Sequence, residues 1–213
     1  MRFFSGKEHQ YPLCSRGFTI IELLIVAAII AIITSLVLVK YVSFDSTILL
    51  KGEAYEIALL LRETQVRSVS SYRNTEGGDL DEQFNYPYGV SFDTATPGSY
   101  VMFLYEDTDK NVVPEYPHAD AVKIMEYNLP ESMEIIELCY KLLGSGTCTS
   151  TDKIDISFRR PEFQSIFKTG YPDPGSGIIE KVQIKIHATR PGAGTGVFVV
   201  EVSKLGQISV YRE

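Results

Sequence analysis

The longest apolar run of the chain extends from Phe18 to Val39, and Glu22 is its only strongly polar side chain. At a rise of about 1.5 Å per residue, a helix of this length is roughly 30 Å long, the thickness of one hydrocarbon core. Core helices of globular proteins are usually amphipathic and shorter, whereas this run is apolar on all sides. The pattern therefore predicts a membrane span, with a carboxylate near one end that needs a partner.

An amphipathic segment follows the apolar run, and nothing between the two forces a break. No proline occurs between Pro12 and Pro87, so a helix can continue. From Ser46 to Tyr72 apolar residues recur at helical spacing, and most charged residues fall on the other faces. The pattern predicts one helix of some 50 residues, with a membrane-spanning half over residues 18–40 and an amphipathic half over residues 41–73. The predicted apolar face consists of Leu50, Ala54, Ile57, Ala58, Leu61 and Val69.

Beyond the helix the spacing of apolar residues changes from about 3.6 to 2, which is typical of strands. The clearest alternation places Val182, Ile184 and Ile186 on one face, and Lys204-Leu205-Gly206 is typical of a hairpin turn. The expected fold class is α+β, with a β-rich head over residues 74–213 in which an antiparallel sheet packs on the helix. Strands are predicted near Gly89–Asp93, Ser99–Tyr105, Ala121–Asn128, Met133–Tyr140, Ile154–Phe158, Ile179–Ala188, Val197–Ser203 and Gln207–Tyr211.

Residues 1–17 precede the apolar run and have the properties of a leader peptide. They carry a net charge of +2 and contain no apolar segment of their own, whereas an ordinary secretory signal places its apolar region before the cleavage site. Cleavage after Gly17 would free the amine of Phe18, one helical turn from Glu22. Between two staggered subunits, this amine and the carboxylate could neutralise each other and so fix a register.

The sequence from Ser15 to Val26 resembles the type IV prepilin cleavage and methylation motif, because it joins a glycine, an aromatic residue, an acid at fixed spacing and a span. The resemblance implies cleavage after Gly17 by a membrane prepilin peptidase and N-methylation of Phe18. It also implies a salt link from Glu22 to the amine of Phe18 on a neighbouring subunit of a helical filament.

The same resemblance implies a pilin-like fold, in which residues 18–40 become part of the filament core after assembly. It also implies the partners and the location of the protein. The partners are other pilin or pseudopilin subunits bound through helix packing, an inner-membrane assembly platform, and membrane lipid before assembly. The implied location is the cytoplasmic (inner) membrane, crossed once, with the head in the periplasm or outside the cell, and a filament after assembly. Major type IV pilins commonly carry a proline near the position of Val39, and this departure favours a minor subunit.

Three segments of the head add a narrower resemblance. Leu61–Ser68, Val101–Leu104 and Val200–Val210, in this order, are similar to the H-type minor pseudopilins of type II secretion and to FimT-like minor pilins. The implied function is that of a non-enzymatic minor pilin or pseudopilin in a type IV pilus or a type II secretion pseudopilus. The alternatives are a major type IV pilin and a membrane-tethered adhesive or DNA-binding module exported through the pilin pathway.

The charge balance argues against a general affinity for nucleic acid. The formal net charge is −7, and loss of the leader makes it −9, whereas nucleic-acid binding depends on neutralising phosphates. Arg159, Arg160 and Lys168 are local basic groups, and a solvated face is the favoured interpretation for them.

The cysteines predict one disulfide. Cys14 leaves with the leader, and Cys139 and Cys148 remain as an even pair in a segment placed outside the cytoplasm, where disulfides persist. Closing this short loop would contribute about 2–3 kcal/mol.

The side chains of Asp107, Asp109 and Asn111 place oxygen atoms at alternate positions, as at the start of a calcium loop. Val112 stands where an EF-hand needs glycine, and His118 stands where it needs its bidentate acid. A calcium site in an irregular loop with Glu115 and an acidic solvated turn both remain open, and the sequence favours the turn.

The motifs of common enzymes are missing from the sequence. No Gly-x-Ser-x-Gly nucleophile context occurs, and the three histidines share no spacing typical of zinc ligands. The sequence therefore predicts a protein that is not an enzyme. The three histidines of the sequence are His9, His118 and His187.

Overall fold

The computed structural model describes residues 17–70, 86–106, 112–159, 163–175, 177–189 and 196–213, and for residues 39–46 it describes the helical backbone only. The chain divides into two compact units, Met1–Tyr41 and Val42–Glu213. Their described residues form one helix, α1 (Ile20–Val69), followed by ten strands. The strands are β1 (Tyr88–Asp93), β2 (Ser99–Tyr105), β3 (Ala121–Asn128), β4 (Met133–Leu142), β5 (Thr149–Thr151), β6 (Lys153–Phe158), β7 (Ser165–Thr169), β8 (Ile179–Ala188), β9 (Val197–Ser203) and β10 (Ile208–Arg212).

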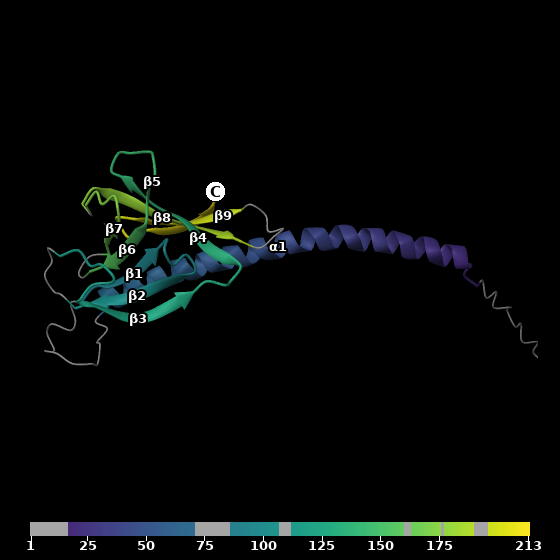
Figure 1. Ribbon diagram of the computed structural model, residues 1–213, viewed down its shortest axis with the longest axis horizontal. Helices are drawn as coiled ribbons and strands as arrows, with labels where there is room; N and C mark the ends of the chain where they lie inside the picture. The colour runs from purple at the N-terminus through teal and green to yellow at the C-terminus, as the bar shows by residue number, and fades with distance from the viewer. Residues whose placement is uncertain (1–16, 71–85, 107–111, 160–162, 176, 190–195) are drawn as a thin grey trace, which may run out of the picture. The chain divides into compact units, whose positions relative to one another are not determined.

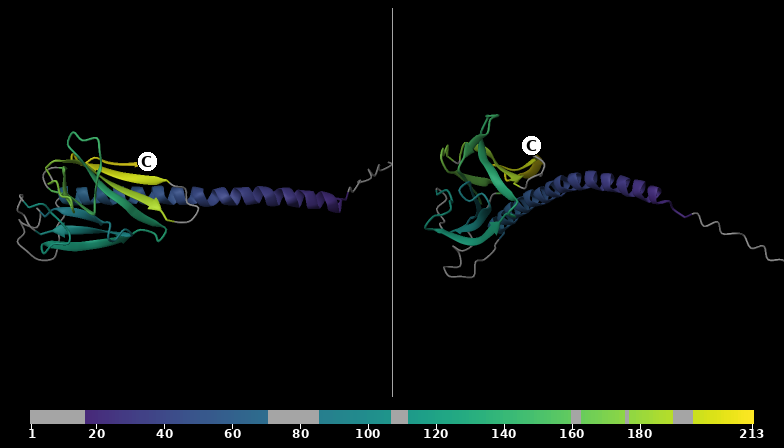
Figure 2. Two further views of the ribbon diagram at one scale, coloured as in Figure 1. Left: turned by 45° about the horizontal axis from the view of Figure 1, so that its top comes forward. Right: turned by 45° about the vertical axis from the view of Figure 1, so that its right-hand side comes forward.

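The strands form two antiparallel sheets of five strands each (Figures 1 and 2). Sheet A has the order β3-β2-β1-β6-β7, and sheet B has the order β10-β9-β8-β4-β5. The two sheets and the second half of α1 share one hydrophobic core. The predicted α+β, pilin-like class is confirmed, and the single sheet expected from the sequence is in fact two.

The second half of α1 contributes a stripe of buried side chains to this core. Leu50, Ala54, Ile57 and Leu61 are at most 2% exposed, and their spacing of three or four residues puts them on one face of a helix. The stripe continues through Thr64, Gln65 and Ser68, which are also buried. The sequence had placed Val69 on this face instead, because apolar spacing cannot identify polar residues that are buried.

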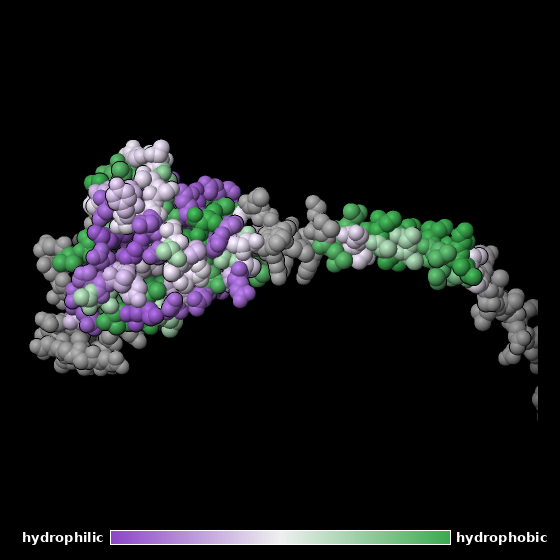
Figure 3. All heavy atoms as spheres, in the orientation of Figure 1, coloured by the Kyte–Doolittle hydropathy of each residue, from purple (hydrophilic) through white to green (hydrophobic). Residues whose placement is uncertain are grey.

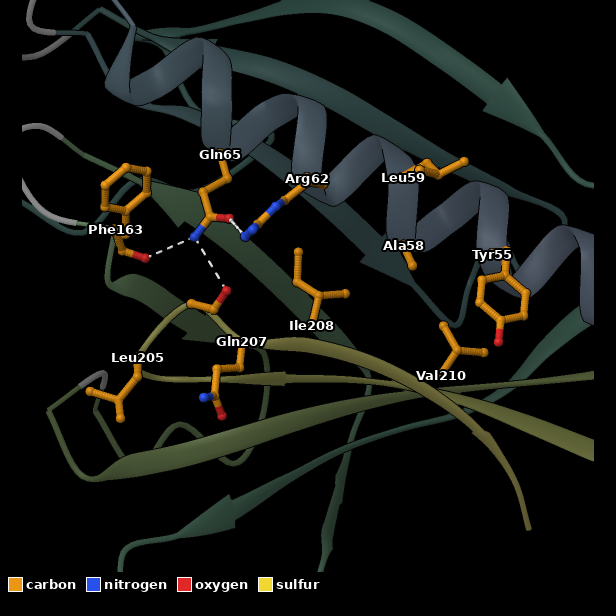
Figure 4. Close-up of a pocket in the computed structure, with 11 residues that line it drawn as sticks. Tyr55, Ala58, Leu59, Arg62, Gln65, Phe163, Leu205, Gln207, Ile208 and Val210 are labelled. Atoms are coloured by element: carbon orange, nitrogen blue, oxygen red, sulfur yellow. Dashed lines mark hydrogen bonds between the residues drawn. The ribbon is translucent and has the colours of Figure 1, made fainter.

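Two buried polar side chains of α1 bond to the head. The hydroxyl of Ser68 accepts a hydrogen bond from the backbone N–H of Tyr88 at the start of β1 (3.0 Å). Gln65 Nε2 donates to the carbonyl oxygens of Phe163 (3.0 Å) and Gly206 (3.2 Å) (Figure 4). Because unpaired buried amides are costly, these bonds explain why a polar side chain is tolerated on the inner face of the helix.

The β9–β10 turn depends on glycine at position 206. Gly206 has φ +80°, and a Cβ atom there would overlap the carbonyl oxygen of Phe163 and crowd Gln65 Nε2. Both the left-handed backbone and the close approach of the chain exclude a side chain. The hairpin predicted at Lys204-Leu205-Gly206 is confirmed by the pairing of β9 with β10.

All eight predicted strands are confirmed within two residues at each end, and two further strands, β5 and β7, were missed. α1 ends at Val69, and residues 71–73 of the predicted amphipathic half lie outside the described residues. Gln183 on β8 alternates with the apolar face of Val182, Ile184 and Ile186 and is also buried, where its Nε2 donates to Glu201 Oε2 and to the Tyr211 hydroxyl, both at 2.7 Å.

Sheet A buries one carboxyl group. Asp155 on β6 is 1% exposed, its Oδ2 lies 3.1 Å from Lys153 Nζ, and it accepts a hydrogen bond from the backbone N–H of Tyr116 (3.2 Å). Burial raises the pKa of Asp155 to about 6, against the opposing effects of Lys153 and the Ser91 hydroxyl. The folded state therefore binds a proton at this group more tightly than the unfolded state does.

Replacement of Gly206 by alanine should destabilise the head more than replacement of another left-handed glycine. Gly175 also has a positive φ (+84°), but no heavy atom lies within 4 Å of a Cβ built there. Gly175→Ala adds backbone strain alone, and we expect a fall in Tm of about 2–4 °C. Gly206→Ala adds overlap as well, and we expect a fall of about 6–12 °C. Thermal unfolding of the detergent-solubilised chain, followed by circular dichroism, measures both; equal shifts would contradict the close approach.

The stability contribution of Asp155 should fall as the pH rises. Because its pKa is raised to about 6 from an ordinary 3.8, the contribution is fully present below about pH 4 and is lost as the pH passes about 6. Asp155→Asn removes this titration, so the Tm of the wild type relative to the variant should be higher at pH 4.5 than at pH 7. The full span corresponds to about 2–3 kcal/mol. A Tm difference that is the same at both pH values would show that the carboxyl group does not titrate in this range.

Candidate functional site

The candidate site lies at the start of α1. Gly17, Phe18 and Thr19 precede the helix and are all exposed, with Phe18 79% exposed. No heavy atom lies within 4 Å of a Cβ built at Gly17. The backbone on either side of the Gly17–Phe18 bond is thus uncovered by the part of the chain that the structure describes.

Thr19 is the N-cap of α1. Its carbonyl oxygen accepts the first helical hydrogen bond from the N–H of Leu23 (3.2 Å), and its hydroxyl accepts one from the N–H of Glu22 (3.3 Å). Thr-x-x-Glu is the pattern of a capping box, in which an acid occupies the third helical position. The residues of this capping box, Thr19 and Glu22, could have been identified from the sequence alone. The capping box fixes the first turn of the helix at the motif itself.

Glu22 lies in the first turn of α1 and is exposed. Its carboxylate interacts favourably with the positive end of the helix dipole. Among the described residues, no cationic side chain lies within ion-pair distance of it. Phe18 is four positions before Glu22 but precedes the helix, so the structure does not place the two residues on one helix face, as the spacing alone had predicted.

The helix that follows is suited to a membrane by length and composition. Ile20–Leu38 forms a 19-residue apolar segment, none of which is buried. Figure 3 shows the apolar side chains continuing along this segment. The hydroxyl of Thr34 donates to the carbonyl oxygen of Ile30 (2.7 Å), so this polar group is satisfied within the helix and does not need water.

The structure joins Cys139 to Cys148 by a disulfide, with the two Cα atoms 5.7 Å apart. Cys139 is a buried residue of β4, and Cys148 directly precedes β5. The bridge therefore holds the connection between two strands that pair at the edge of sheet B. A closed loop of this length limits the unfolded chain modestly.

The residues proposed as calcium ligands cannot be located, because Asp107, Asp109 and Asn111 fall in a segment outside the described residues. The Nδ1 atom of His118 lies 3.2 Å from both the Tyr105 hydroxyl and an Asp120 carboxylate oxygen. Among the described residues no group of three or more potential ligands could hold a metal ion. Calcium binding therefore remains a prediction.

The basic groups considered for ligand contact are used within the head. Lys168 Nζ lies 2.8 Å from Asp173 Oδ2, and this hydrogen bond raises the pKa of Lys168. Arg159 Nη2 donates to the carbonyl oxygen of Val112 (3.1 Å), while Arg160 lies outside the described residues. The contacts of Lys168 and Arg159 are those of local structure and not of an anion site.

Comparison with known proteins identifies the start of the chain. The profile of the prokaryotic N-terminal methylation motif matches residues 13–38, which include Gly17, Phe18, Thr19 and Glu22. No curated protein and no solved structure matches the chain at a significant level. The matched motif, together with the apolar helix and the two-sheet head, supports a type IV prepilin-like protein.

Proposed function

We propose that the chain is the precursor of a non-enzymatic minor pilin or pseudopilin. It is cleaved after Gly17, methylated on the amine of Phe18, and assembled by helix packing into a type IV pilus or a type II secretion pseudopilus. The observation that carries this proposal is one acid in the first turn of an otherwise apolar, fully exposed helical segment, directly after the Gly17–Phe18 bond.

The unpaired carboxylate of Glu22 can fix the register between neighbouring subunits. Within a bilayer, Glu22 costs about 2.5–3.5 kcal/mol at the midplane and less near the interface. The amine of Phe18, once freed, carries the opposite charge at the same end of the helix. A single helix cannot pair the two groups well, because both project sideways into lipid. A neighbouring subunit that is shifted along the axis can bring an amine to each carboxylate, which fixes the register more than it adds stability.

The cap at Thr19 places the amine close to the helix. After cleavage the mature chain begins with Phe18, so the N-cap is its second residue and the first turn follows at once. A positive charge at a helix N-terminus is unfavourable, and an acid in the first turn offsets it. Glu22 therefore serves the helix of its own chain as well as the amine of another.

The apolar helix needs little energy to leave the bilayer. Its side chains are exposed on every face in the single chain, so lipid and a filament core of packed apolar helices are comparable surroundings for them. The head stays outside that core. The absence of a proline near Val39 favours a minor subunit over a major pilin, and the number of copies per filament separates these two functions.

Processing should be visible in the mass of the protein. From a host that carries a prepilin peptidase, the membrane-extracted chain should lack its first 17 residues and carry one added methyl group at Phe18. Gly17→Val should leave the leader in place, because a branched side chain at the cleaved bond blocks its approach to the peptidase. Gly52→Val is the control, because Gly52 lies within α1, away from the cleaved bond, and a Cβ there also meets no heavy atom within 4 Å; it should be processed normally. Intact precursor on every wild-type molecule would refute the proposal.

Glu22→Ala should be processed but should enter filaments poorly. Removing one member of an ion pair inside an apolar core leaves the other unpaired, at a cost of about 3–5 kcal/mol, so we expect incorporation to fall by at least about tenfold. Ser35→Ala changes a polar side chain on the same segment and should assemble as the wild type does. Quantitative immunoblotting of sheared filaments measures both. Normal incorporation of Glu22→Ala would remove the registering role.

A further inference from the structure

A groove separates α1 from β10 in the head, within the unit of residues 42–213 (Figure 4). Its volume is about 710 Å³, within the usual size of ligand sites. Several of its apolar side chains are left in solvent: Leu59 is 68% exposed, Phe163 58% and Leu205 70%. A cluster of exposed apolar side chains on a folded domain is typical of a surface that binds a ligand or another protein.

The β10 wall of the groove is a free sheet edge. β10 is the last strand of sheet B, and β9 contributes no residue to the groove. Two hydrogen bonds, from Ser203 N to Gln207 O and from Glu213 N to Val197 O, fix the pairing of β10 with β9. They show that the backbone N–H and C=O groups of the odd-numbered residues of β10 point toward β9. By the alternation of an antiparallel pair, the N–H and C=O groups of Ile208, Val210 and Arg212 face away from β9.

These outward groups have no hydrogen-bond partner among the described residues. A row of alternating donors and acceptors is matched by another extended backbone and by little else. β10 is five residues long, so it offers an edge of about 17 Å to a segment of similar length. The side chains of Ile208 and Val210 point toward α1 in Figure 4 and would lie beside the apolar side chains of such a segment.

The α1 wall of the groove is positively charged. Arg62 lines it, and Lys51 Nζ lies 5.9 Å from the ring centre of Tyr55, another lining residue. The positions one helical turn from Arg62 hold Ala58, Leu59, Gln65 and Val66, none of them acidic. No described carboxylate lies within ion-pair distance of Arg62. Its Nη1 donates instead to Gln65 Oε1.

The acids of the same part of α1 lie toward sheet A. Burial raises the pKa of Tyr100 on β2, and the nearby carboxylates of Glu53 and Glu56 raise it further. Glu63 acts in the same way on Tyr127 of β3. The acids Glu53, Glu56 and Glu63 thus lie beside sheet A, where Arg67 pairs with Glu63. Arg62 is the one charged side chain that lines the groove among the described residues. An acidic occupant complements the groove, although the chain as a whole is acidic.

We propose that this groove binds an extended segment of a partner protein, which adds a strand to β10, places apolar side chains against α1, and carries a carboxylate that pairs with Arg62. The interaction is independent of filament assembly through Glu22. Main-chain hydrogen bonds to β10 supply affinity, and the apolar groove with its one cation supplies selectivity.

A defined peptide tests the proposal on the full chain in detergent micelles. The probe is a fluorescent, end-blocked peptide of about six residues, in which valines alternate with threonines and one end residue is glutamate. We expect saturable binding by fluorescence anisotropy. We also expect slower amide hydrogen exchange at Ile208, Val210 and Arg212, because these outward N–H groups gain partners. Absence of binding would overturn the proposal.

Backbone pairing is separated from simple apolar contact by a second peptide. The same sequence, N-methylated at alternate residues on its pairing edge, keeps its side chains but loses its donors, and should bind at least about tenfold more weakly. On the protein, Val210→Pro removes an outward N–H that β9 does not use, whereas Val210→Thr keeps it. Proline should weaken binding and threonine should not, with Tm values showing that both variants fold. Equal affinity for the methylated peptide would overturn strand addition.

The ionic contact is tested by exchanging both partners. Arg62→Gln should weaken the glutamate peptide by about three- to tenfold and leave a glutamine peptide unchanged. An equal loss for both peptides would show that Arg62 acts only through Gln65 and would overturn the carboxylate assignment. If the three outward amides are already protected in the chain without peptide, a second copy or another part of the protein covers the edge, and the proposal fails.

Discussion

The head depends on a single buried stripe along the second half of α1. Leu50, Ala54, Ile57 and Leu61 fill the space against both sheets. The inner faces of the two sheets need such a partner, because an apolar sheet face must be buried against another element. The stripe is continuous with Gln65 and Ser68, which are polar and equally buried. Apolar burial therefore holds the middle of the amphipathic half, while hydrogen bonds to the β9–β10 turn and to the start of β1 fix its end.

The elements that the sequence predicted well are those in which burial and spacing coincide. The apolar helix, the alternating strand Ile179–Ala188 and the hairpin at Gly206 each carry a complete local pattern. β7 does not, because the inward side chains of Ser-Ile-Phe-Lys-Thr are Ser165, Phe167 and Thr169, of which only one is apolar. β5 has three residues and no apolar one, and it becomes a strand only through its pairing with β4.

Candidate site residues could be predicted from the sequence to the extent that their chemistry is local. The spacing of Gly17, Phe18 and Glu22 needs no tertiary structure to be meaningful, because all three belong to one helix start. The Thr19 cap was available from the same letters. By contrast, Arg62 and Val210 are 148 positions apart in the sequence and line one groove only in the folded head. A local sequence pattern cannot predict that Arg62 has no carboxylate within ion-pair distance, because this depends on which faces of α1 the two sheets cover.

The four sheet edges show why β10 differs from the others. An exposed edge is a liability that proteins blunt with short strands or with charge. β5 is three residues long, and β3 carries the exposed Lys123–Glu126 pair; β7 places Lys168 beside Asp173. β10 offers outward backbone groups between apolar side chains and beside the unpaired cation Arg62. An open strand edge favours aggregation unless a specific partner covers it. The open edge of β10 lies next to a groove, and binding of a partner segment explains this arrangement better than a lack of protection does.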